Sequence, residues 1–160
     1  MKRSMALLLL CVSVSAVFAG CGGSDVTFAR RGITGLAQGR YATRKMIDWT
    51  VFTALDKDIG AEYRDLANDK ERLAYERSFI DNFKTAFRAQ KGSLKAFYDW
   101  RFYGQRRPDV TIVAASIKEQ DILFLVVIRR AYGTRKIIGI KALRVLDEDK
   151  LEEFRQEFLQ

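Results

Sequence analysis

The chain has 160 residues, with 28 Lys and Arg against 20 Asp and Glu, two Cys and no His. The lack of His excludes His-based catalytic triads and the usual zinc sites, and the sequence has no nucleophile-elbow or phosphate-loop motif. The composition therefore favours a binding or structural role over catalysis, and neither a metal nor a cofactor is expected.

Residues 1–20 have the layout of a secretory signal peptide. Lys2 and Arg3 form a basic start, and an uncharged, mainly apolar run then leads to the small residues Ala19 and Gly20. This run is shorter than the roughly 20 apolar residues that a transmembrane helix needs. The mature protein is therefore not expected to span a bilayer.

The tetrad FAGC, residues 18–21, resembles the lipobox of bacterial lipoproteins. The resemblance implies that Cys21 is acylated, becomes the new N-terminus and anchors the protein in a membrane, with residues 22–24 as a short spacer. Gly22 follows the Cys where an Asp would favour the inner membrane, which implies the periplasmic side of an outer membrane in a Gram-negative cell. The alternative is an ordinary secretory peptide cleaved near Ala19, which would leave Cys21 free.

Residues 25–160 are expected to form a single domain, because they are near the commonest domain size and contain neither a long linker nor a repeat. Without the signal peptide the net charge is +6, from 26 Lys and Arg and 20 Asp and Glu. In a secreted protein this charge indicates anionic lipid or envelope polymers as partners, and not nucleic acid. No disulfide is expected, because Cys11 leaves with the signal peptide and Cys21 carries lipid.

Two helices are expected in the first part of this domain. Residues 25–38 place apolar side chains at approximate helical spacing, although Gly32 and Gly35 weaken the pattern. Asp48 is a candidate N-cap for a short helix that reaches Leu55, and a polar turn follows.

The clearest predicted element is a helix over residues 69–90. Asn68 and Glu71 have the spacing of a capping box, and Gly92 is a typical stop. At 1.5 Å per residue this helix is ~33 Å long. It is long enough to lie across a whole sheet.

From residue 94 the pattern becomes that of β-strands. Aromatic and β-branched runs separated by short turns predict four antiparallel strands at 94–103, 110–116, 122–130 and 135–146. Residues 147–160 are acidic at their start and predict a C-terminal helix. N-terminal helices followed by an antiparallel meander define an α+β fold.

The order of these elements, with the aromatic run YDWRFYG in the first strand, resembles the NTF2-like fold and more loosely the cystatin-like fold. The resemblance implies helices packed on a curved four-stranded meander that encloses a cone-shaped pocket or dimerises through its sheet. Residues 122–128 are all apolar, so both faces of the third strand should be covered. The C-terminal helix, a second subunit and an apolar ligand are the alternatives for the second face.

The candidates for binding an apolar ligand are the aromatic residues Trp49, Tyr98, Trp100 and Phe102. Strand alternation predicts that the last three of these share one side of the sheet. Asp99 lies among them, and desolvation there would raise its pKa as a general base requires. The simpler interpretation is an ion pair between Asp99 and Arg101.

Basic residues are expected to gather at one end of the meander, because the first and third turns lie at the same end. The candidates for contact with an anionic surface are Arg101, Arg106, Arg107, Arg129, Arg130, Arg135 and Lys136. Such residues attract anionic lipid when they lie near a bilayer. The alternative is a solvated rim that keeps the strand ends from pairing.

The sequence as a whole predicts a lipid-anchored envelope protein with a non-catalytic, NTF2-like domain. This domain would bind a small apolar or anionic ligand, an envelope protein or a second copy of itself. One alternative is a module similar to periplasmic phospholipid-binding and transport proteins. The other is an NTF2-like isomerase or dehydratase with Asp99 as its base.

Overall fold

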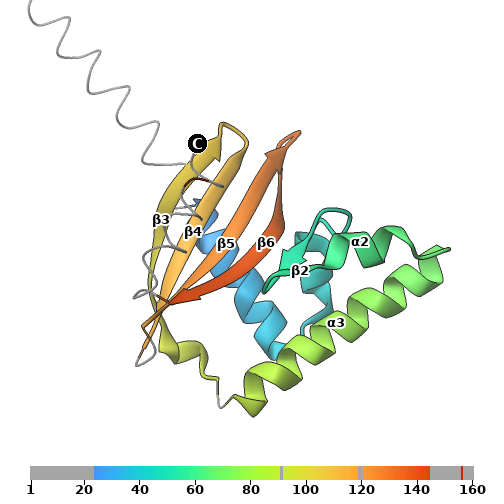
Figure 1. The fold of residues 1–160 in the computed structure, drawn as a ribbon, viewed down its shortest axis with the longest axis horizontal. Helices are drawn as coiled ribbons and strands as arrows, with labels where there is room; N and C mark the ends of the chain where they lie inside the picture. The colour runs from blue at the N-terminus through green and yellow to red at the C-terminus, as the bar shows by residue number, and fades with distance from the viewer. Residues whose placement is uncertain (1–23, 91, 119–120, 145–155, 157–160) are drawn as a thin grey trace, which may run out of the picture.

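The computed structural model describes residues 24–90, 92–118, 121–144 and 156, which form an α+β fold around one sheet (Figure 1). The helical elements are a helix over residues 24–38, η1 (Tyr41–Met46), α2 (Ile59–Arg64), α3 (Asp69–Ala89) and η2 (Leu94–Ala96). The strands are β1 (Thr53–Ala54), β2 (Lys57–Asp58), β3 (Phe97–Arg107), β4 (Val110–Ile117), β5 (Ile122–Ala131) and β6 (Thr134–Arg144). The predicted α+β class is therefore confirmed.

The sheet has six strands in the order β2-β1-β6-β5-β4-β3. Strands β3 to β6 pair antiparallel in chain order, at the four predicted places. Beyond β6, however, β1 pairs in parallel with it, with Thr53 opposite Gly139, and β2 forms the edge. The prediction of a four-stranded antiparallel meander is therefore wrong, because the sheet is mixed and larger.

Strand β1 lies where the end of a short helix was expected, and β2 lies in the polar turn that was expected after it. Leu55 and Asp56 have positive φ angles and form a tight turn between β1 and β2. The backbone N–H of Asp48 donates to the carbonyl of Ile137, and that of Leu55 donates to the carbonyl of Ile140. The open edge of β6 thus supplies the backbone hydrogen bonds that a helix would have made locally, and Asp48 caps no helix here.

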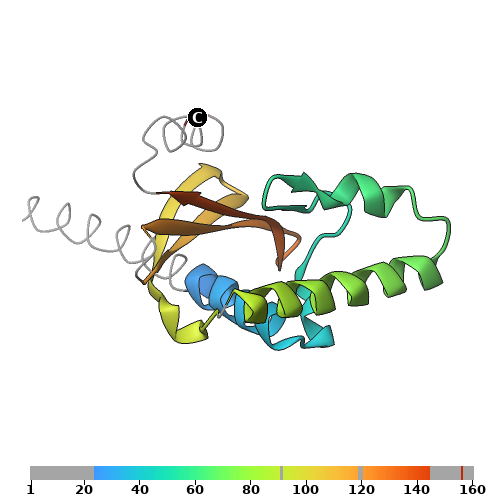
Figure 2. The same cartoon turned by 60° about the horizontal axis from the view of Figure 1, so that its bottom comes forward.

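Helix α3 agrees closely with its predicted range. The side chain of Asn68 accepts a hydrogen bond from the backbone N–H of Glu71, and the Glu71 carboxylate accepts in return from the Asn68 amide and the Ala67 N–H. Figures 1 and 2 show that α3 runs past the edge of the sheet toward α2. Only its C-terminal half approaches the sheet, so it does not lie across the whole of it.

The helix over residues 24–38 is confirmed, and its glycines have a packing role. A Cβ atom added at Gly32 would lie 2.4 Å from the Cδ1 atom of Ile137, and one added at Gly35 would lie 2.0 Å from the Oγ1 atom of Thr43. The glycines therefore let this helix approach β6 and η1 closely. This close packing outweighs their low helix propensity.

Both faces of the sheet are buried at its centre, as the apolar run of β5 predicts. One cluster lies between the sheet and the helices and includes Ile33, Phe52 and Ile80. A second cluster on the opposite face includes Ile112 and Leu125. The predicted C-terminal helix lies outside the described residues, apart from Gln156, which is helical.

The predicted signal peptide and Cys21 also lie outside the described residues, which begin at Ser24. Within the described part of the chain, no helix is long and apolar enough to cross a membrane.

Candidate apolar pocket and charged sheet end

A cavity of about 520 Å³ lies between the C-terminal half of α3 and one end of the sheet. Its wall is mainly apolar and aromatic, with polar groups from the α3–η2 turn and the end of β4. The residues that form it are Leu55, Phe83, Ala86, Phe87, Gln90, Gly92, Ser93, Ala96, Phe97, Ile117, Lys118, Ile122, Phe124 and Ala142. This volume is within the ~300–1,000 Å³ range of small-molecule sites.

Phe97 holds the aromatic wall of the pocket together. Its ring stacks on Phe87 of α3 at 6.0 Å between centroids, and meets Phe124 of β5 edge to face at 5.2 Å. The chain reaches Phe97 through η2, whose N-cap Ser93 accepts a hydrogen bond from the N–H of Lys95. A short, capped turn after α3 therefore aligns the helix with the first strand across the pocket.

The structure does not bring the four predicted ligand-binding aromatics together. Trp49 is buried in the core, where it packs on Phe52 and Phe79 and donates its indole N–H to the Arg44 carbonyl. None of the four lines the pocket: Trp100 packs behind Phe97, and the other two are half exposed on β3. Phe97 and Phe124, which do line the pocket, were not predicted as ligand-binding residues, although both are aromatic residues within predicted strands.

The predicted alternation along β3 is wrong at Asp99. The register with β4 shifts between Tyr98 and Arg101, and Asp99 has a φ of +51°. This irregularity inserts an extra residue, so that Phe97 and Trp100 stack on the same side of the sheet instead of on opposite sides.

Asp99 is exposed and forms an ion pair with the guanidinium of Arg101. It is not among the residues that line the pocket. The simpler of the two interpretations from sequence, the ion pair, is therefore confirmed. The general-base interpretation requires a desolvated carboxylate, whereas the side chain of Asp99 is exposed to solvent.

The strand register brings the predicted basic residues of the two turns to one end of the sheet, which we call the charged end. Val110 pairs with both Arg107 and Arg129, and the N–H of Arg130 donates to the carbonyl of Asp109. Arg101 lies further along β3, opposite Ala114, and Arg106 is exposed near the end of that strand.

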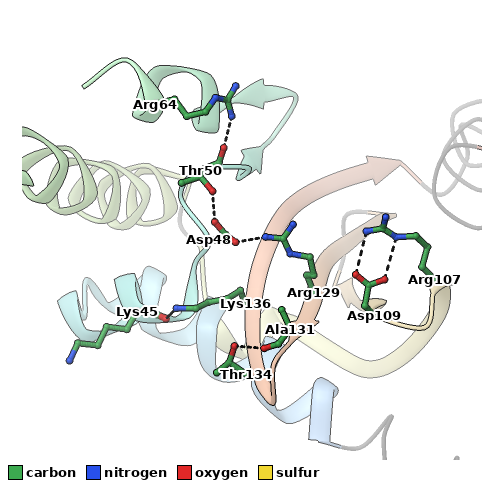
Figure 3. Close-up of polar contacts among 10 residues, drawn as sticks. All are labelled: Lys45, Asp48, Thr50, Arg64, Arg107, Asp109, Arg129, Ala131, Thr134 and Lys136. Atoms are coloured by element: carbon green, nitrogen blue, oxygen red, sulfur yellow. Dashed lines mark hydrogen bonds and ion pairs between the residues drawn. The ribbon is translucent and has the colours of Figure 1, made fainter. Parts of the chain in front are cut away.

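Most cations of the charged end have a carboxylate or carbonyl partner (Figure 3). Arg107 pairs with Asp109 at 3.3 Å, and Arg129 pairs with Asp48 at 2.5 Å. Lys136 donates to the carbonyl of Lys45. These residues therefore tie neighbouring segments to the sheet. This structural role was not predicted, because the two interpretations from sequence were contact with an anionic surface and a solvated rim.

Asp48 connects the charged end to the segment before β1. Burial alone raises the pKa of its carboxyl, but hydrogen bonds from Thr50 and Arg129 outweigh burial and hold that pKa below its ordinary value. The carbonyl of Thr50 in turn accepts a hydrogen bond from Arg64 of α2 (Figure 3). The carboxylate therefore holds the loop before β1 against β5.

Asp25 is the most deeply buried carboxylate of the charged end, with no exposed surface. It forms ion pairs with Arg130 and with Arg135, the latter at 2.8 Å, and Arg135 also donates to the Ser24 hydroxyl. This arrangement, the Asp25 clamp, fixes the start of the first helix against the β5–β6 hairpin.

Glu76 forms a second buried polar contact, between α3 and the elements before it. Its carboxylate accepts hydrogen bonds from Arg44 of η1 at 3.1 Å and from the Tyr63 hydroxyl of α2 at 2.8 Å. Burial and this hydrogen bond raise the pKa of Tyr63 to about 12. The contact is structural, since it joins three helical elements away from the pocket.

Neither the site nor the chain can be assigned by comparison, because no protein-family model and no curated protein matches the sequence. Within residues 24–90, 92–118 and 121–144, no three His, Cys, Asp or Glu side chains gather as metal ligands.

Proposed function

We propose that this protein is a lipid-anchored envelope protein whose domain binds an apolar ligand in the pocket between α3 and the sheet. The observation that carries the proposal is the aromatic pocket of about 520 Å³. An apolar cavity of this size with a few polar groups at its rim is typical of a ligand-binding site.

The composition of the wall defines the ligand class. Phe83, Phe87 and Phe124 would contact an apolar body, while Ser93 and Lys118 add a hydroxyl and an exposed ammonium. The ligand we propose therefore has an apolar part and a polar or anionic head near Lys118. A single acyl chain with a carboxylate has this chemistry.

The anchoring part of the proposal rests on Cys21 and the apolar run before it. Three acyl chains would hold the protein on a bilayer, since each buried methylene contributes ~0.8 kcal/mol. Gly22 after the Cys favours the outer membrane of a Gram-negative cell. In the Cys21→Ser variant, membrane attachment and incorporation of labelled fatty acid should both be lost.

The NTF2-like resemblance is supported by the consecutive antiparallel strands β3 to β6, the helices on one face and the pocket beneath a long helix. The parallel strand β1 departs from the meander expected on that basis. The pocket also favours the phospholipid-binding alternative, because an apolar wall accepts an acyl chain from a phospholipid as well as from a fatty acid. The enzyme alternative gains no support, since Asp99 is exposed and paired.

The proposal is tested by native mass spectrometry of the gently purified protein and by titration with a fluorescent fatty acid. Ala86→Trp should fill the pocket from α3, whereas Ala74→Trp places the same bulk on an exposed position of that helix outside the pocket. We expect binding to be lost in the first variant and retained in the second.

A bound phospholipid mass would favour the lipid-transport alternative over a fatty-acid site. Equal probe binding by the two Trp variants would show that the pocket is not the binding site. A wild-type protein that carries no ligand and binds no probe would contradict the proposal, and would leave the surface for protein partners or a homodimer.

A further inference from the structure

The tip of the β5–β6 hairpin carries Tyr132, a residue that the fold does not require. Tyr132 is fully exposed, and its φ of +50° is followed by +75° at Gly133. The hydroxyl of Thr134 donates to the Ala131 carbonyl and closes the turn. Two consecutive positive φ angles favour Asn-Gly in a tight hairpin, and a bulky residue is unfavourable at the first of them. Neither packing nor turn geometry therefore explains an aromatic residue here.

The same end of the sheet is where the chain from Cys21 enters the domain. The Asp25 clamp holds Ser24 and Asp25 against the base of this hairpin. Cys21 is three residues before Ser24, a separation of at most ~11 Å for an extended chain. An anchor at Cys21 would therefore keep the hairpin tip close to the bilayer surface.

The charge of this end suits an anionic surface. The cations at this end are Arg106, Arg107, Arg129, Arg130, Arg135 and Lys136, and the carboxylates there are those of Asp25, Asp48 and Asp109. The excess of three cations attracts anionic lipid near a bilayer. Tyrosine is enriched at membrane–water interfaces, because its ring is apolar and its hydroxyl is polar.

We propose that the β5–β6 hairpin tip inserts Tyr132 into the headgroup region of the anionic bilayer to which Cys21 is anchored, with the Asp25 clamp setting the orientation of the domain. This proposal rests on the lipid anchor of the proposed function.

The hairpin contact also places the pocket away from the membrane. Ile122 of the pocket and Arg130 of the charged end are separated by eight residues of β5, or ~27 Å. Ligand would then exchange on the side remote from the bilayer.

The test uses the mature lipidated protein in vesicles of phosphatidylethanolamine and phosphatidylglycerol that carry a headgroup nitroxide quencher. Tyr132→Cys places a fluorophore at the tip, and Asp121→Cys places the same fluorophore at an exposed position just before β5, at the opposite end of the sheet. We expect several-fold stronger quenching at position 132 than at position 121. Exchange to phosphatidylcholine vesicles should weaken the quenching at position 132.

Flotation of the same vesicles separates the two proposals. Protein that does not float contradicts the lipid anchor, whereas protein that floats with equal quenching at both positions overturns the hairpin contact alone. Floating protein quenched at neither position also overturns it, and leaves the tip to a protein partner. Equal quenching at position 132 in anionic and phosphatidylcholine vesicles would overturn the assignment to anionic lipid.

Discussion

The Asp25 clamp makes a quantitative prediction about stability. Asp25 has no exposed surface, whereas the side chains of Arg130 and Arg135 are 28% and 38% exposed. Asp25→Asn keeps the shape and one acceptor oxygen but removes the charge that both guanidinium groups face. Hydrogen bonds to charged groups contribute ~1.5–3 kcal/mol, and breaking a buried pair costs ~3–5 kcal/mol. Because water still reaches both arginines, we expect a loss of ~2–4 kcal/mol in the free energy of unfolding.

The matched control is Asp109→Asn, which removes the charge from the same residue type at the same end of the sheet. Its partner Arg107 is 59% exposed and Asp109 itself is 43% exposed, so this pair should contribute ~0–1 kcal/mol.

Urea denaturation followed by circular dichroism measures both variants against the wild type. A lower midpoint with an unchanged slope indicates a change in stability alone. If Asp25→Asn lost no more than Asp109→Asn, the buried clamp would not hold the helix to the hairpin. The clamp could then not set the orientation of the domain in the proposed membrane contact.

Three further variants test other parts of the structure. Gly35→Ala should destabilise the protein despite the better helix propensity of Ala, because its Cβ would lie 2.0 Å from the Thr43 Oγ1 atom; a more stable variant in thermal unfolding would contradict this packing. Tyr132→Asn should raise the unfolding free energy by ~0.5–1 kcal/mol, because Asn accepts a positive φ more readily; a loss of stability would show that the ring packs in the fold. The pKa of Tyr63 is raised to about 12 from an unfolded value of 10.0, so its protonated form is favoured by folding. The contribution of Tyr63 to the free energy of unfolding is complete below pH 10 and is lost as the pH rises toward 12. The urea midpoint should therefore fall more steeply with pH over this range in the wild type than in Tyr63→Phe. If the midpoints of the two proteins fell in parallel, the result would contradict the Glu76 contact.

The two ends of the sheet carry different features, and this separation bears on function. The charged end holds the entry of the chain and the exposed Tyr132, whereas the pocket lies near the β4–β5 turn. A bilayer contact at one end would leave the pocket accessible from the other. Separate substitutions would then alter the proposed ligand binding and the proposed anchoring.

Local sequence patterns determined the elements that depend on neighbours in the chain. The capping box at Asn68 and the helical spacing after it predicted α3, and the β-branched and aromatic runs predicted the strands from β3 to β6. The unbroken apolar run of β5 also predicted that both faces of the sheet are covered. Each of these signals involves residues within a few positions of one another, so sequence alone contains them.

Tertiary structure alone decided the features that depend on distant partners. The two-residue strand β1 exists because β6, more than 80 residues later, offers it an open edge. The pocket requires Phe87, Phe97 and Phe124 from three elements, and the clamp joins Asp25 to Arg130 and Arg135 across more than 100 residues. No local propensity specifies such pairings, because the energy of each depends on where the rest of the chain has packed.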